Sequence, residues 1–401
     1  MANVINGTST GSGGLISSGD DSGILNIQTN ETTAMSIDAS QSVDFTNNID
    51  APNTFGFENR IINGGMVIDQ RNAGASVNTN GAYPVDRFSQ LMSGGGVLTS
   101  QQSSTAPTDF INSIFTTVST ADASIAAGDY YLLRHAIEGL NVADLNWGAT
   151  AAAAGKTAAS VTLSFKVRSS VTGTFSGALE NSAEDRSYPF TYSIASANTW
   201  TNISITIAGD TSGTWLTTNG VGIYINFDLG TGSTRLNTAN AWVGAQSFGA
   251  TGSVQLISTV NATFYITGVQ LEKGTQATSF DFRSIGTELA LCQRYLPAFS
   301  GSGISAFGYT YNTGQNNIFL FNFPVETRVP PTGIAISSVS HFSAINGSNA
   351  GQSPTSFSAN NFGKNSSSVV TSNASGFTIA QPSRLESNTG VARIIFTGAE
   401  L

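Results

Sequence analysis

Four tryptophans are the residues of this 401-residue chain best suited to holding a ligand: Trp147, Trp200, Trp215 and Trp242. Each lies in or beside a turn-like segment, whereas the phenylalanines occupy positions patterned for a core. An indole ring can stack on the apolar face of a sugar while neighbouring amides and hydroxyls bond the sugar hydroxyls. We therefore predict a glycan-binding site among these four side chains, with core packing as the alternative for each.

Side chains for catalysis are scarce. The two histidines, His135 and His341, lack the flanking residues of a nucleophile elbow or a zinc helix. Glu180, Glu184 and Asp185 could supply the acid pair of a glycosidase, but an arginine follows them in a polar turn, which favours a solvated loop. We expect no catalytic residues and no enzymatic activity.

Metal and cofactor motifs are weak as well. Asp20 and Asp21 are adjacent carboxylates without the spacing of an EF-hand loop. The glycines at 94–96 are not followed by the lysine of a phosphate-binding loop. Cys292 is the single cysteine, which excludes intrachain disulfides and multi-cysteine metal sites. We expect neither a metal nor a cofactor.

The charge content narrows the possible partners. Only 10% of the residues are charged and the net charge is −9, whereas soluble proteins average about 25% charged residues. Nucleic-acid binding needs clustered lysines and arginines, and no basic run occurs. The surface must be built mainly from Ser, Thr, Asn, Gln and Gly, which can bond neutral sugars or simply hydrate a β-rich fold.

Targeting and membrane segments are not evident. The N-terminus has no basic region followed by an apolar stretch, and no segment approaches ~18 consecutive apolar residues. We expect neither a standard export signal nor insertion into a membrane.

Residues 1–57 form a segment of their own. In ILNIQ and MSIDA apolar and polar residues alternate, which predicts short strands between Asn, Asp and Gly turns. A few short strands are marginally stable alone, so this segment should pack against copies of itself or dock onto another protein. The Gly/Ser-rich stretch 7–23 also permits a disordered tail.

Alternation with period two dominates from residue 58 to residue 283. In SVTLSFKVR, one face of the strand carries Val161, Leu163, Phe165 and Val167, and the other face carries polar residues. Similar runs recur between Gly- and Asn-containing turns without interleaved helices, a pattern that fits an antiparallel sandwich or jelly roll. Gly268 within FYITGVQLEKG predicts a β-bulge.

One stretch, residues 284–297, is patterned as a helix. Ile285, Leu289, Cys292 and Tyr295 recur at helical spacing, with Pro297 as the stop. The four alanines at 151–154 should lie in a loop despite their helix propensity. Residues 298–401 then return to alternating runs, which predict a second, smaller β-sandwich.

The predicted fold is therefore all-β, with antiparallel jelly-roll or β-sandwich domains. Its parts are a short N-terminal β anchor segment (1–57), a jelly roll (58–283), one short linking helix (284–297) and a C-terminal β-sandwich (298–401).

Several motifs resemble a phage tail-fibre and adhesin family with a carbohydrate-binding-module-like jelly roll. They are NRIINGGMVIDQRNAG (59–74), YPVDRF (83–88) and FYITGVQLEKGTQATSFDFRSIGTELALCQRYL (264–296). FNFPVETRVPPTG (321–333) and the terminal GAEL (398–401) resemble the small domain that often follows. The resemblance covers the module borders, and residues 89–263 match in pattern alone.

The resemblance implies a role outside catalysis. Such proteins are virion structural subunits, commonly homotrimers, assembled in the host cytoplasm and attached to other virion proteins through an N-terminal segment, here residues 1–57. We expect a tail fibre or spike that binds a host-surface glycan or protein. The alternatives are a capsid decoration or head-fibre protein and, less favoured, a depolymerising tailspike.

The residues of these motifs also have a structural interpretation. Arg71, Asp86 and Arg87 could form an ion pair that fixes a loop, which we favour over contact with a ligand. Phe280, Phe282 and Arg283 should cover the end of the sandwich where the helix begins.

Overall fold

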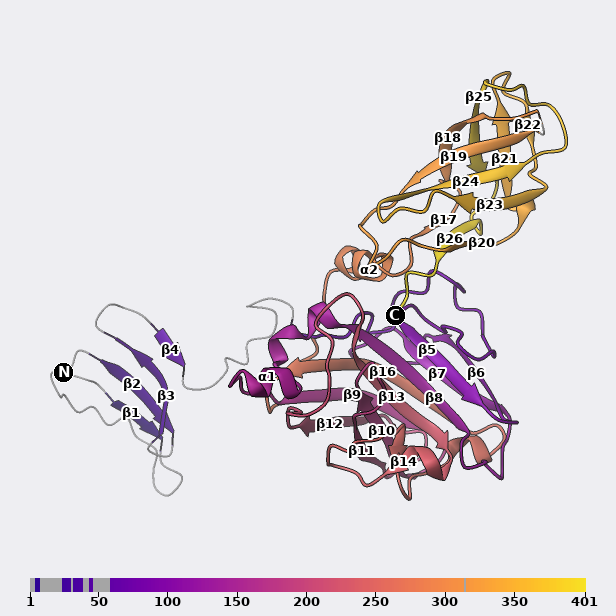
Figure 1. Ribbon diagram of the computed structural model, residues 1–401. Helices are drawn as coiled ribbons and strands as arrows, with labels where there is room; N and C mark the ends of the chain where they lie inside the picture. The colour runs from indigo at the N-terminus through magenta and orange to yellow at the C-terminus, as the bar shows by residue number, and fades with distance from the viewer. Residues whose placement is uncertain (1–3, 8–23, 30–31, 39–42, 46–57, 314) are drawn as a thin grey trace. The chain divides into compact units, whose positions relative to one another are not determined.

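The computed structural model describes residues 4–7, 24–29, 32–38, 43–45, 58–313 and 315–401. The chain divides into two compact units between Gly56 and Phe57. Strands supply most of the secondary structure in both units (Figure 1), and nearly all of them pair antiparallel. The predicted all-β class is confirmed. Within the described part of the chain, no helix is both long and apolar enough to cross a membrane.

The first unit contains one four-stranded sheet. Both predicted strands are present in it, and the Gly/Ser-rich stretch between the first two strands lies outside the described residues. Where side-chain exposure is described in this unit, no residue is fully buried, which agrees with a sheet too small to enclose a core. In the order β1-β2-β3-β4 the strands are Val4–Gly7, Leu25–Thr29, Thr32–Ile37 and Val43–Phe45.

Two five-stranded sheets face each other in the first sandwich of the second unit. One sheet has the order β11-β10-β13-β8-β5, with strands Ser187–Ile194, Gly173–Glu180, Val221–Thr231, Tyr130–Glu138 and Phe88–Ser93. The other has the order β12-β9-β16-β7-β6, with strands Thr201–Ile207, Val161–Ser169, Thr263–Lys273, Ser113–Thr120 and Val97–Ser103. A two-stranded sheet joins β14 (Leu236–Asn237) to β15 (Gly249–Ala250).

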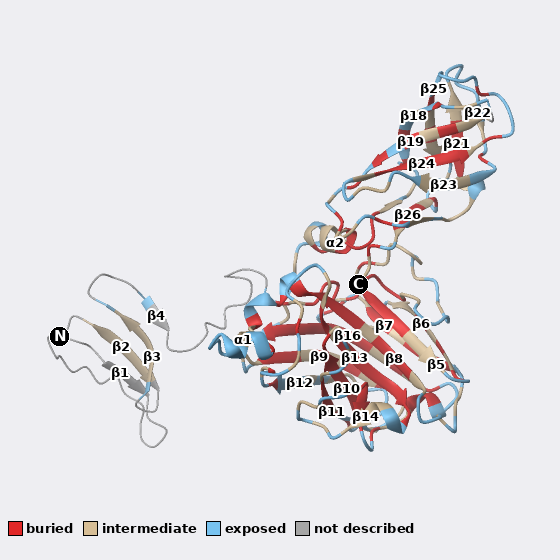
Figure 2. Ribbon diagram, viewed as in Figure 1, coloured by how far each residue is buried: buried red, intermediate tan, exposed pale blue. Residues whose placement is uncertain are grey.

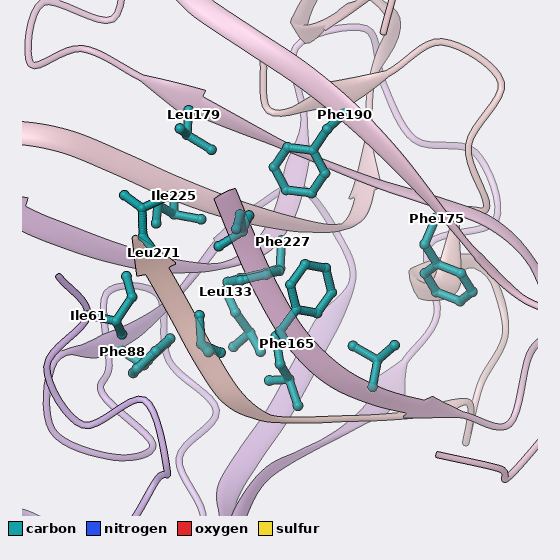
Figure 3. Close-up of a cluster of buried hydrophobic side chains, with 14 of the residues drawn as sticks. Ile61, Phe88, Leu133, Phe165, Phe175, Leu179, Phe190, Ile225, Phe227 and Leu271 are labelled. Carbon is teal, nitrogen blue, oxygen red and sulfur yellow. The ribbon is translucent and has the colours of Figure 1, made fainter. Parts of the chain in front are cut away.

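The core of this sandwich is filled from the inner faces of both sheets (Figure 3). On β9 the four apolar residues predicted to share a face are all buried. The Phe165 ring packs edge-on against Tyr192 and Phe227, with centroids 5.1 and 5.2 Å away. Because the side chains of a strand alternate between faces, burial of one set leaves the other set on the outside of the sheet.

The predicted bulge at Gly268 is also present. The register between β16 and β9 shifts between Thr267 and Gln270, and Gly268 has a φ of 62°. A Cβ here would lie 2.7 Å from the Phe110 ring, so the close approach of that ring requires a glycine.

The helices are shorter or differently placed than predicted. The linking helix α2 spans Ile285–Gln293 and is shorter than the predicted 284–297, and Ile285, the first residue of the apolar spacing, is 63% exposed. The alanines expected in a loop mostly belong to a helix, α1 (Ala149–Ala153). The short 3-10 helices are Gly139–Asn141, Ala143–Leu145, Ser233–Arg235, Leu256–Ser258 and Val339–His341.

The remaining strands form a second sandwich with its own core, which includes Phe319, Phe342, Leu385 and Phe396. Figure 2 shows buried residues along the strands of both sandwiches. The smaller sheet, β17-β26-β20, contains Ala298–Ser300, Arg393–Thr397 and Gly333–Ile336. The larger sheet, β22-β21-β25-β18-β19-β24-β23, contains Gly351–Gln352, Phe342–Asn346, Pro382–Ser387, Ser305–Thr310, Asn316–Asn322, Ser366–Ser372 and Ser356–Asn360.

The ion pair expected near the start of the jelly roll is present in a modified form. Arg71 lies 3.5 Å from Asp86, as a scaffold role predicts. Arg87 instead pairs with Glu400, near the end of the chain. The motif residues therefore contribute to internal packing in this part of the molecule.

Candidate functional site

A row of four outward side chains crosses the β12-β9-β16-β7-β6 sheet of the first sandwich. Arg168 on β9 is the register partner of Tyr265 on β16, Tyr265 is the partner of Phe115 on β7, and Phe115 is the partner of Gln101 on β6. Their neighbours along each strand point into the core, so these four side chains stand on the solvent face. None of the four is buried.

Aromatic rings occupy the middle of this row. Tyr265 and Phe115 stack with centroids 4.6 Å apart and planes at 24°. Trp200, immediately before β12, meets Tyr265 edge-on at 6.1 Å. We call Trp200, Tyr265 and Phe115, together with Arg168 and Gln101, the aromatic row.

Polar side chains flank the aromatic row on both sides. Thr263, Thr117 and Thr99 are successive register partners on one side. Asn202, Lys166 and Thr267 are successive partners on the other side. Thr267 is buried, and its hydroxyl donates to the Asn112 carbonyl. Partly exposed aromatic rings bordered by hydroxyls and amides are groups that can bind sugar rings.

An apolar groove adjoins this face where the chain enters α2. Phe110, Phe280 and Phe282 form its aromatic wall, with ring centroids 4.8 to 5.3 Å apart. Its volume is about 300 Å³, and Ile111 (72% exposed) and Ile285 (63%) lie at its rim. The prediction that Phe280 and Phe282 cover this end of the sandwich therefore missed an open groove.

The polar groups of the groove mainly form hydrogen bonds within the protein, to residues in or next to the groove walls. Asp281 accepts hydrogen bonds from the backbone nitrogens of Glu58 and Asn59. Arg283 donates to the Ile61 carbonyl at 2.9 Å. Lys166 connects the groove to the aromatic row, since its Nζ lies 5.7 Å from the Phe110 ring centroid.

Three of the four predicted tryptophans come together, away from the aromatic row. Trp147, Trp215 and Trp242 meet pairwise edge-on, with centroids 4.9 to 5.3 Å apart, and Tyr188 packs on Trp242. Trp147 is 7% exposed and Trp215 is 9% exposed.

The indole N–H groups of this cluster are used internally. Trp147 donates to the Ala159 carbonyl at 2.7 Å and Trp242 to the Ala208 carbonyl at 2.8 Å. Trp215 donates to Asp210 at 3.2 Å. This geometry is that of an aromatic core, and Trp200 alone among the four predicted residues lies on the face of the aromatic row.

The carboxylates considered as an acid pair surround an arginine. Arg134 donates to Glu180 and to Glu184, both at 3.1 Å, while Asp185 accepts from Asn181. Glu180 is fully buried, so the solvated-loop prediction is wrong for this residue. Burial raises the pKa of Glu180 to about 7, although the charge of Arg134 opposes the shift.

The histidines lie in separate surroundings. His135 is buried beside the Phe88 ring at 4.7 Å, and desolvation lowers its pKa well below the usual value. The His341 ring bonds the Ser337 hydroxyl at 2.8 Å. Among the residues that the structure describes, no group of three or more His, Cys, Asp or Glu side chains is placed to hold a metal ion.

Tyr265 and Phe115 were missed as site residues in the sequence analysis. Each occupies the outward position of an alternating run, in ATFYITGVQ and SIFTTVST, where a polar residue is the norm. An aromatic side chain at a solvent-facing position of a strand is the sequence signal that could have identified these two residues. Their adjacency depends on strand order, which alternation does not give.

No protein-family model and no curated protein matches this sequence. Parts of solved structures resemble the chain at low identity. One is the enzymatically active domain of tailspike protein 4 from bacteriophage CBA120 (13% identity, TM-score 0.28), with 54% of this chain and 21% of that chain covered. The aligned part is thus a minor portion of the tailspike.

Two further structures are carbohydrate-binding modules of Clostridium thermocellum enzymes. The family 11 module of a cellulosomal cellulase matches at 12% identity and a TM-score of 0.26, with 52% of this chain and 100% of the module covered. The family 22 module with its xylanase domain matches at 13% identity and 0.25, with 49% and 28% covered. Because these TM-scores are low, the fold of this chain is assigned from its own strand pairing.

Proposed function

We propose that this chain is a non-enzymatic phage virion subunit, a tail fibre or spike that attaches to a host-surface glycan through the aromatic row. The observation that carries the proposal is the stacked pair Tyr265 and Phe115, with Trp200 beside it, on the solvent face of a rigid sheet. The resemblance of the motifs at 59–74 and 264–296 to phage tail-fibre modules supports the virion setting.

The geometry suits a sugar ring for physical reasons. Each of the three rings has a partner that limits its motion, so little side-chain entropy is lost when a ligand stacks on it. The flanking Thr117 and Asn202 supply a hydroxyl and an amide beside the rings. Such groups can both donate and accept, as sugar hydroxyls require.

The arrangement of the acidic residues supports a binding role over catalysis. Glu180 and Glu184 share one arginine, and Asn226 also donates to Glu180 at 2.6 Å. A glycosidase needs one carboxyl free to protonate the substrate and another free to attack or to activate water. Incubation of the protein with host polysaccharide should therefore leave the polymer length unchanged.

Binding is tested with a glycan array and with whole host cells. Tyr265→Ala should lower affinity roughly 5- to 150-fold if sugar stacking contributes as much as base stacking on an aromatic ring, about 1–3 kcal/mol. Tyr309→Ala is the matched control, since Tyr309 is an exposed strand tyrosine (52%) in the second sandwich. If Tyr309→Ala abolishes binding and Tyr265→Ala does not, the aromatic row is not the binding face.

The position in the virion is tested separately. Antibody labelling of intact particles should place the chain on the tail, and a label on the head would favour the decoration or head-fibre alternative. The small first sheet, with no fully buried side chain where exposure is described, supports association through residues 1–57. A solution mass of three chains is expected, and a monomer would contradict the trimer.

A further inference from the structure

We infer that the glycan bound by the aromatic row is acidic, and that Arg168 binds its carboxylate. This inference rests on the proposed function and narrows it to one class of ligand. Arg168 lies beside the stacked rings, as the register partner of Tyr265.

Two contacts position the Arg168 side chain and leave the two Nη atoms of its guanidinium available. Its Nε donates to the Asn198 carbonyl at 2.9 Å, and the guanidinium carbon lies 5.0 Å from the Tyr265 ring centroid. Neither Nη atom donates to a described residue. A guanidinium oriented in this way can bind a carboxylate with its remaining N–H groups.

Arg168 also lacks an acidic partner within the protein. Ion pairs hold many of the other arginines, such as Arg134, Arg186 and Arg294. For Arg168, no Asp or Glu carboxylate of the described residues lies within the 4.0 Å of an ion pair. Lys156, Arg235, Arg328 and Arg393 also have no ion pair among the described residues, but Arg168 is the one of these five cations that belongs to the aromatic row.

A second cation stands on the same side of β9. Lys166 is two residues from Arg168, so the two side chains project about 7 Å apart along the strand. Among the described residues, the one carboxylate that pairs with Lys166 is that of Asp109, at 3.7 Å, and Asp109 is 70% exposed. Because an exposed pair of this kind is weak, Lys166 can turn to an anionic ligand at little cost.

Neutral sugars would not need this pair of cations. Stacking on Tyr265 and Phe115 binds any sugar with an apolar face, whereas a guanidinium adds affinity for a sugar that carries a carboxylate. The class of ligand that fits is thus a polysaccharide of uronic or sialic acids.

The test compares acidic polysaccharides with their carboxyl-reduced forms. The probes are hyaluronan, polygalacturonate and polysialic acid, each native and after reduction of the carboxyl to a primary alcohol, with neutral glycans on the same array. We expect at least one native acidic polymer to bind roughly tenfold or more tightly than its reduced form. Arg168→Gln should remove the difference in affinity between the native polymer and its reduced form.

Matched variants separate charge from geometry. Arg168→Lys keeps the charge and loses the planar fork, so it should recover only part of the preference. Arg384→Gln alters an arginine of the second sandwich that pairs with Glu386 and should have no effect. Raising the salt concentration should weaken binding of the native polymer more than that of its reduced form.

The outcomes distinguish this inference from the proposed function. Tyr265-dependent binding of neutral glycans, with no acidic polymer preferred over its reduced form, overturns the acidic class and leaves the glycan-binding function intact. A preference for the acid that persists in Arg168→Gln overturns the role of Arg168. Absence of binding to every glycan, neutral or acidic, overturns both.

Discussion

The guanidinium of Arg87, near the start of the jelly roll, lies 3.6 Å from the ring centroid of Tyr295, two residues after the end of α2. The same guanidinium donates to the Ala136 carbonyl at 2.6 Å and pairs with Glu400. Arg71 reaches Glu400 as well, at 2.8 Å. Glu400 therefore connects the last residues of the second sandwich to the first sandwich.

Replacing Glu400 should weaken this connection. Burial alone would raise the pKa of Glu400, but the charges of Arg87 and Arg71 hold it below its usual range. In Glu400→Gln, Arg87 remains buried without its anion, whereas Arg71 keeps Asp86. Loss of one partner of a buried pair costs about 3–5 kcal/mol. Urea denaturation should show a loss of this size. Glu326→Gln removes an exposed pair with Lys364 and should cost less than ~1 kcal/mol; equal losses would contradict the prediction.

Glu180 should make stability depend on pH. Its folded pKa of about 7 exceeds the ordinary 4.5, so the native state binds the proton more tightly than the unfolded state. The free energy of unfolding should therefore rise as the pH falls from about 7 towards 4.5. Between pH 8 and pH 5 the Glu180 contribution is roughly 2–3 kcal/mol.

The measurement is a difference between wild type and Glu180→Gln, because other buried groups titrate too. Burial raises the pKa of Asp86 to about 6, and desolvation lowers that of His135. Urea midpoints at pH 5 and pH 8 should differ less in the variant than in wild type. The same pH slope in both proteins would show that Glu180 does not titrate in this range.

Local patterning predicted much of the fold. Alternation identified the buried face of β9, and a glycine inside a strand pattern identified the bulge at Gly268. The helix was found but extended too far, because Tyr295 and Leu296 continue the apolar spacing after Gln293 ends α2. Both are buried without being helical, since packing against neighbouring elements decides burial.

The site could be predicted only in part, because it depends on contacts between distant strands. Turn-like surroundings do not separate the tryptophans from the phenylalanines, because Trp147 and Trp215 are buried in the core whereas Phe115 is only partly buried. They did not show that Trp147, Trp215 and Trp242 fold onto one another from three separate segments. Likewise, Phe115 and Tyr265 are 150 residues apart in sequence and become neighbours through the pairing of β7 and β16.

Gly268→Ala should destabilise the protein through backbone strain and, in addition, through a clash with the Phe110 ring of the groove. At a φ of 62° an alanine costs about 1–2 kcal/mol, and its Cβ would also meet the Phe110 ring at 2.7 Å. Gly252 is the matched control, because its φ is 85° and nothing lies within 4 Å of an added Cβ. Thermal unfolding should show a larger loss for Gly268→Ala, by at least ~1 kcal/mol. Equal losses would mean that Phe110 moves aside freely.

Trp147→Ala and Trp200→Ala should separate packing from ligand binding. Trp147 is buried against two other indoles, and truncation of such a residue costs about 3–5 kcal/mol, so this variant should unfold at a much lower urea concentration. Trp200 contacts Tyr265 from the solvent side of the sheet, so its loss should cost ~1 kcal/mol or less. Glycan affinity should follow the opposite order, falling several-fold in Trp200→Ala and remaining near wild type in the folded fraction of Trp147→Ala. If Trp147→Ala stays stable and loses binding, the three-tryptophan cluster is the ligand site and the aromatic row is not.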